Sequence, residues 1–187
     1  MYASKVIDLI LAEHLVPLMK TRGFRRKGQR FWRVTGRFVE LVELQKSAFN
    51  SKREAAFTIN LGVYFHPVGG PGGVRVAIMP PKNYECTIEE RIGTLFGKGL
   101  DSWWEVRGIR QAPRLGEDLC EKVLRFGLPW LESMHDLRAM LRYDREHPGL
   151  FAKREVRKYL KKIRESSNAS KTRRRRSRNK ASVLPKC

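Results

Sequence analysis

The sequence predicts an α+β domain, with an antiparallel sheet of four to six strands packed against an N-terminal helix and C-terminal helices, plus a disordered basic tail. Apolar residues recur every three to four positions near the start and again beyond residue 116, as in amphipathic helices. Between these segments apolar and polar residues alternate, as in strands with one buried face. Residues 166–187 offer almost no apolar surface, so we expect them to form no core.

The first expected element is a helix over residues 3–20, in which Val6 and Ile10 belong to one apolar stripe. Pro17 lies late in this helix. Its ring removes one backbone hydrogen bond, so we expect a kink or a shortened last turn. Gly23 is the expected C-cap.

Strands are expected next along the chain. Residues 28–47 predict two strands joined at Thr35 and Gly36, and residues 57–65 predict another whose odd-numbered apolar residues share one face. Residues 66–75 contain four glycines and two prolines and predict an exposed connection. This segment lacks the Lys-Ser/Thr ending of a phosphate-binding loop.

Two glutamates interrupt the apolar pattern of the expected strand over residues 38–45. Glu40 shares one face with Val42. Glu43 shares the opposite face with Leu41. One glutamate must therefore lie among apolar neighbours, unless this is an edge strand or a bulged one.

The second half of the domain is expected to add two short strands and then helices. The strands are expected at residues 91–96 (RIGTLF) and 103–106 (WWEV). From Gly116 the apolar spacing becomes helical and is interrupted at residues 127–129, which predicts two helices that cover the sheet. A last helix, over residues 151–165, is apolar on one side and basic around the other.

Composition limits the class of protein. Three widely spaced cysteines without a C-x-x-C pair fit reduced thiols in a cytosol. No apolar run approaches the ~20 residues that a bilayer requires, and the N-terminus does not resemble a signal peptide. We therefore expect a cytoplasmic protein with no membrane span.

The positive charge is concentrated at the C-terminal end. The chain has a formal net charge of +20, and residues 151–187 contain fifteen lysines and arginines against two glutamates. We divide the chain into an α+β domain (1–148), a basic amphipathic helix (149–165) and a disordered polycationic tail (166–187). Such a tail must contact anions or remain solvated.

An ordered series of short motifs resembles a bacterial family called domain of unknown function 4304. The series begins with LVPLMKTRGFRRKGQRFWR, continues with LQKS, FTINLGV, RIGTLF and the WW pair, and ends with LPWL. The resemblance covers residues 7–141. It implies a small domain of helix, antiparallel sheet and helix, and it brings no established activity. The extension from about residue 150 lies outside the family pattern.

No group of residues predicts a catalytic, metal or cofactor site. The histidines share no metal-ligand spacing, and no local motif activates Cys86 or Cys120. The carboxylate pairs lie near Lys or Arg, and we expect them to be solvated. These pairs are Glu40 with Glu43, Glu89 with Glu90, and Glu117 with Asp118.

Two groups of residues are candidate binding surfaces. Aromatic and basic residues lie close together in the sequence and could stack bases or meet a protein. The alternatives are tryptophans packed under the flanking helices and an amphipathic strand beside a solvated basic turn. The candidate aromatic–basic surface consists of Arg30, Phe31, Trp32, Arg33, Trp103 and Trp104. The candidate polyanion-binding residues of the tail are Lys171, Arg173, Arg174, Arg175, Arg176, Arg178 and Lys180.

The tail is open to three interpretations: contact with nucleic acid or another polyanion, a solubilising extension, or attraction to an anionic membrane surface, for which it lacks an apolar anchor. The first hypothesis for function is a non-enzymatic binding module with an unidentified partner, to which the tail adds sequence-independent polyanion affinity. The alternatives are a protein-binding regulator or immunity-type module with an incidental tail, and an enzyme of unrecognised type. A deep pocket with converging Glu, His or Cys would favour the enzyme. The sequence indicates no oligomeric state.

Overall fold

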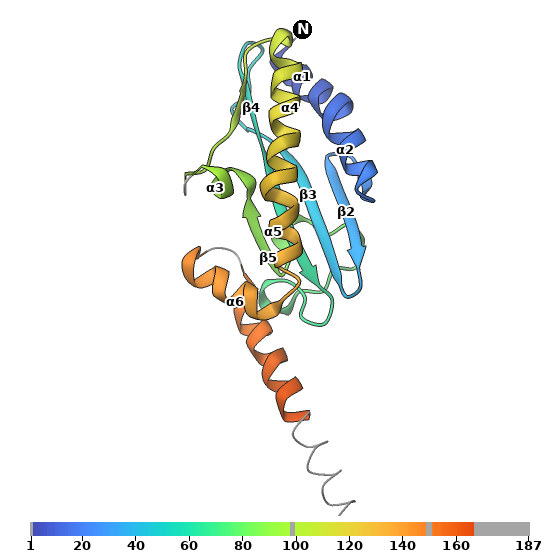
Figure 1. The fold of residues 1–187 in the computed structure, drawn as a ribbon, viewed down its shortest axis with the longest axis vertical. Helices are drawn as coiled ribbons and strands as arrows, with labels where there is room; N and C mark the ends of the chain where they lie inside the picture. Colours follow the sequence, from blue (N-terminus) through green and yellow to red (C-terminus); the bar gives the residue numbers. More distant parts are fainter. Residues whose placement is uncertain (1, 98–99, 149–150, 167–187) are drawn as a thin grey trace, which may run out of the picture.

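A computed structural model describes residues 2–97, 100–148 and 151–166. Its centre is an antiparallel sheet in the order β1-β2-β3-β4-β5, with β6 pairing to the other end of β4 (Figure 1). This sheet confirms the predicted fold class. The strands are β1 (Arg25–Lys27), β2 (Arg30–Thr35), β3 (Phe38–Lys46), β4 (Ala55–Phe65), β5 (Ile88–Arg91) and β6 (Trp104–Val106).

The N-terminal helix is continuous from α1 (Ala3–Ile10) through a π-helical segment, η1 (Leu11–Leu15), into α2 (Val16–Thr21). Its last turn is not shortened at Pro17. A Schellman motif ends the helix, because Gly23 has a φ of +77° and the N–H of Phe24 donates to the carbonyl of Met19 over 3.0 Å. The expected glycine C-cap is therefore confirmed.

The second long helix shows that the predicted interruption at residues 127–129 is wrong. The chain runs without a break through α4 (Ala112–Lys122), the π-helical η5 (Val123–Gly127) and α5 (Leu128–Ser133). Pro129 and the earlier proline each lie two residues beyond a π-helical segment. A π turn relieves the crowding between a proline ring and the preceding carbonyls, so both helices continue past a residue that usually ends them.

A second correction concerns residues 91–96, which were expected to form a strand. The strand β5 ends at Arg91, and the following residues form a short helix, α3 (Ile92–Phe96). Ile92 and Leu95 pack on the core three residues apart, which is helical spacing. So short an apolar run does not distinguish a strand from a helix.

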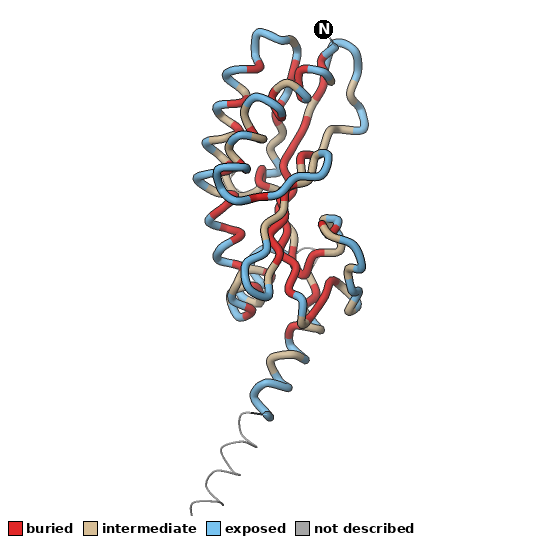
Figure 2. Tube along the Cα trace, turned by 90° about the vertical axis from the view of Figure 1, so that its right-hand side faces the viewer, coloured by how far each residue is buried: buried red, intermediate tan, exposed pale blue. Residues whose placement is uncertain are grey.

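The sheet has two different faces. The odd-numbered residues of β4 lie in the main core beneath the two long helices, as predicted for Phe57, Ile59, Leu61, Val63 and Phe65. On the other face, Val39, Leu41, Tyr64 and Cys86 form a smaller apolar cluster. The rest of that face is polar. Figure 2 shows the buried residues concentrated along the strands and the inner sides of the helices.

The C-terminal part adds α6 (Leu137–Glu146) and the predicted basic helix, which spans residues 153–166. Phe151 forms an isolated β-bridge with Ile88, and the N–H of Ala152 donates to the carbonyl of Thr87 over 2.8 Å. Val156 is buried. Beyond this anchor the helix runs away from the sheet (Figure 1). Among the described residues, none of the helices has the length and apolar character required to cross a bilayer.

Candidate functional site

The outer surface of helix 153–166 is strongly basic. Arg157, Lys158 and Lys162 are exposed and form no ion pair with any residue that the structure describes. Lys153, nearer the body, pairs with Asp144. The predicted polyanion-binding residues, which begin at Lys171, lie outside the described residues. Helix 153–166 is therefore the described part of the cationic C-terminal extension, by which we mean residues 151–187.

The six residues of the candidate aromatic–basic surface do not form one surface in the structure. Phe31 and Trp104 are buried in the main core, and the Trp104 ring stacks on Phe57 with centroids 5.4 Å apart. Arg30 and Trp32 project to the opposite face, because side chains alternate along β2. Strands β3 and β4 separate β2 from β6.

The other two members of this set contact acidic residues. Arg33 donates to Glu40 from Nε over 2.9 Å, and its Nη2 lies 2.7 Å from the same carboxylate. The indole N–H of Trp103 donates to Asp101 over 3.0 Å, and the guanidinium of Arg91 lies over its ring, 5.4 Å from the centroid. Whether either residue binds a partner remains a prediction.

Glu40 is the glutamate that lies among apolar neighbours. Its side chain has no exposed surface, so the expectation that it is solvated is wrong. Besides the Arg33 guanidinium, His135 Nε2 lies 3.0 Å from Glu40 Oε1. Burial raises the pKa of Glu40, although Arg33 opposes that shift by attracting the ionised form. This cluster joins β2, β3 and the end of α5, and we assign it a structural role.

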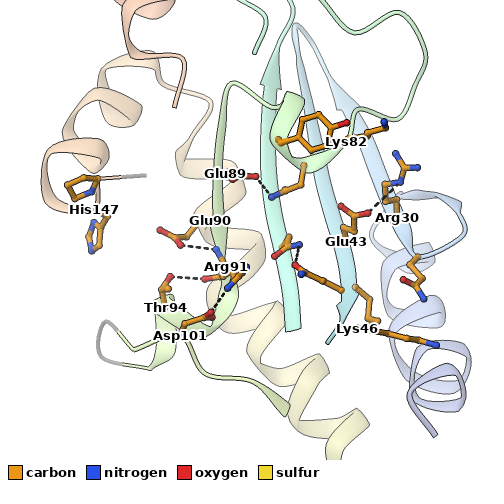
Figure 3. Close-up of a pocket in the computed structure, with 17 residues that line it drawn as sticks. Arg30, Glu43, Lys46, Lys82, Glu89, Glu90, Arg91, Thr94, Asp101 and His147 are labelled. Atoms are coloured by element: carbon orange, nitrogen blue, oxygen red, sulfur yellow. Dashed lines mark hydrogen bonds and ion pairs between the residues drawn. The ribbon is translucent and has the colours of Figure 1, made fainter. Parts of the chain in front are cut away.

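The polar face of the sheet contains a pocket of about 920 Å³. We call it the open-face pocket, and Figure 3 shows its side chains converging from several elements. Strands β2 to β5 form its floor. The turn at residues 82–84, α3, Asp101 and residues 147–148 form its walls. The residues used below are Arg30, Glu43, Asn60, Asn83, Glu89 and Arg91.

Strand register assembles the floor of the open-face pocket. Arg30 is opposite Glu43, Glu43 is opposite Asn60, and Asn60 is opposite Arg91, so one polar row crosses four strands. These residues are far apart in the chain, and sequence reasoning missed them as a group. Asn60, a polar residue within the most apolar strand, was the usable signal.

A glycine shapes the adjacent row. Gly62 lies opposite Glu89 in β5, and a Cβ at this position would lie 2.5 Å from Cys86 Sγ and 3.1 Å from Asn83 Oδ1. The missing side chain therefore lets the turn that carries Asn83 approach the sheet. This close approach forms one wall of the open-face pocket.

Burial dominates the electrostatics of the open-face pocket. Desolvation raises the pKa of Glu43, against the attraction of Arg30. Desolvation also raises the pKa of Glu89, against the attraction of Arg91 and the hydrogen bond from Asn83. Glu89 is half-buried rather than solvated, so the expectation of a solvated carboxylate is wrong here too.

The neighbouring Glu90 is also half-buried, and Tyr143 of α6 donates to it over 2.8 Å. Burial raises the pKa of the Cys86 thiol well above its usual value, which keeps that thiol protonated. No group of three or more His, Cys, Asp or Glu side chains in the described ranges could hold a metal ion. The lining of the open-face pocket presents the carboxylates of Glu43 and Glu89 and the amide of Asn60.

A family comparison covers the segment that forms this site. The model of the domain of unknown function family DUF4304 matches residues 15–133. The chain belongs to the DUF4304 family. No curated protein and no solved structure matches it. The DUF4304 segment contains all six strands of the described residues and most of the open-face pocket, whereas His147 and helix 153–166 lie beyond it.

Proposed function

We propose that this protein is a non-enzymatic binding module that holds nucleic acid or a similar polyanion through its cationic C-terminal extension. The observation that carries the proposal is the attachment of helix 153–166. Val156 and Ala152 are buried against the body, whereas the cations on the outward side of the helix are exposed. An extended polyanion could therefore contact the helix without disturbing the core.

The chemistry of this contact is general rather than sequence-specific. Lysine and arginine on an exposed helix neutralise phosphates and release condensed counterions, which yields affinity without base recognition. Seven more cations lie between Lys171 and Lys180 in the sequence. They would add to the same electrostatic contact.

The test compares two triple variants with equal loss of charge, using DNA and RNA of mixed sequence. In the first, Arg157, Lys158 and Lys162 are changed to Gln. In the second, the exposed body residues Lys5, Lys20 and Arg114 are changed to Gln. The salt dependence of binding is measured by fluorescence anisotropy for both variants, the full chain and residues 1–166.

We expect a steep salt dependence for the full chain, with a log–log slope whose magnitude falls by about 0.9 for each phosphate that a variant no longer neutralises. The helix variant should neutralise about two to three fewer phosphates than the full chain, and the body variant should differ less from it. Removing residues 167–187 should also reduce the magnitude of the slope relative to the full chain. Absence of salt-sensitive binding by the full chain, or equal effects of the two triple variants, would overturn the proposal.

A further inference from the structure

The open-face pocket contains hydrogen-bond acceptors without donors. Asn60 is only 8% exposed, and its Nδ2 donates to Gln45 Oε1 over 2.7 Å. Its carbonyl oxygen accepts no hydrogen bond from any described residue. Asn83 repeats this arrangement, since its Nδ2 donates to Glu89 while its buried Oδ1 has no partner in the described chain. Asn60 lines the open-face pocket, so its oxygen is suited to a ligand's donor, whereas Asn83 Oδ1 is packed toward Gly62 and Cys86 beneath the turn.

The two carboxylates of the floor are also incompletely neutralised. No Lys, Arg or His nitrogen of the described residues lies within ion-pair distance of Glu89. Glu43 has only Arg30, whose Nε is 3.7 Å away. Because burial penalises the ionised form of both glutamates, a positive group placed between them would stabilise their charge.

Two of the cations around the open-face pocket already form close ion pairs. Lys46 Nζ lies 2.6 Å from Asp8, and Arg91 Nη1 lies 2.5 Å from Asp101. Lys82 is exposed to solvent. Arg30 and Lys82 stay at one side of the pocket, and the acceptors that remain for a ligand on the floor are the carboxylates of Glu43 and Glu89 and the oxygen of Asn60, in a chain whose formal net charge is +20.

We infer that the open-face pocket binds an organic cation, a protonated amine or a guanidinium group, between Glu43 and Glu89 and above Asn60. An ammonium offers three donors and a guanidinium five, which suits a set of carboxylate and amide oxygens. A pocket of about 920 Å³ is large enough for a small molecule or for one side chain of a bound peptide. This site is independent of the cationic extension, which repels such a ligand.

The test measures binding to the full chain by isothermal titration calorimetry and by backbone amide NMR shifts. The probes are agmatine, as a free cation, and an acetylated, amidated Gly-Arg-Gly peptide, as a side-chain source. We expect saturable binding with shifts centred on Asn60 and Glu89. The stronger probe identifies the source of the cation, because the peptide adds backbone groups that a free amine lacks.

Isosteric variants test the role of the carboxylates. Glu89→Gln and Glu43→Gln should each weaken binding about tenfold or more, since each removes a charge-assisted contact. Glu117→Gln makes the same change at an exposed site on α4 and should leave affinity unchanged. Both floor variants keep their size, and thermal unfolding checks that they fold.

The inference is overturned if neither probe saturates by ~10 mM, the range of very weak affinity. It is also overturned if both floor variants bind like the Glu117→Gln control. Binding of inorganic phosphate in place of the cations, with shifts at the same amides, would contradict it as well.

Discussion

Glutamates on the two faces of the sheet have different surroundings. Glu40 and Glu43 lie three residues apart on β3, and both carry a raised pKa because of burial. Glu40 faces the long helices, where Arg33 and His135 surround it. Glu43 faces a pocket and has one loose cationic contact. The covering layer, rather than the strand, therefore decides whether a carboxylate is structural or available to a ligand.

The largest expected effect separates two neighbours on β4 that project to opposite faces. Leu61→Ala should lower the free energy of unfolding by ~2–5 kcal/mol, because Leu61 is fully buried in the main core. Asn60→Ala removes one hydrogen bond to Gln45 and should cost only ~0.5–1.5 kcal/mol. Urea denaturation measures both. Equal losses would mean that the open face serves stability as much as the covered face does.

The next effect concerns the wall of the open-face pocket. Gly62→Ala should cost ~1–3 kcal/mol of stability, because the added methyl group collides with Cys86 and must displace the turn that carries Asn83. Cation binding should weaken in parallel. Gly108→Ala is the control, because Gly108 has extended backbone and no atom within 4 Å of an added Cβ. If Gly62→Ala matches this control, the close approach of the turn does not shape the pocket.

The smallest expected effect is a pH dependence of stability that arises from Glu40 on the covered face. Because burial raises the pKa of Glu40, the native state holds this proton more tightly than the unfolded chain does. The wild type should therefore lose stability relative to Glu40→Gln as pH rises from about 4, near the unfolded value, through the raised native pKa.

At neutral pH the cost of Glu40→Gln should stay below the ~3–5 kcal/mol typical of breaking a buried ion pair, because the amide oxygen still accepts from Arg33. Denaturation midpoints between about pH 4 and 8 measure the trend. Glu117→Gln, an exposed change of the same kind, is the control. The interpretation is contradicted if Glu40→Gln and Glu117→Gln change stability with pH in the same way relative to the wild type.

Long periodic segments made much of the fold predictable. The alternation in residues 57–65 and the apolar stripe from residue 3 each depend on one buried face, which a single segment records in its own sequence. The errors arose where tertiary structure overrode a local sequence rule. Pro129 should interrupt a helix, but a π-helical turn before it relieves the crowding, and residues 91–96 were too short for their period to be decisive.

The open-face pocket could not be predicted in the same way. Arg30, Glu43 and Asn60 become neighbours only through the register of three strands, which no local spacing specifies. The sequence predicted that one of the two glutamates on β3 lies among apolar neighbours, unless the strand is an edge strand or a bulged one. It could not show which one, because that choice depends on the face that the helices cover.

The bridge between Phe151 and Ile88 covers one end of the outer edge of β5. β5 is the last strand of its path and would otherwise present unpaired backbone groups. Exposed edges of this kind favour self-association. A fragment that stops before residue 151 would lose this partial cover and should aggregate more readily than a chain ending at residue 166, which keeps the bridge.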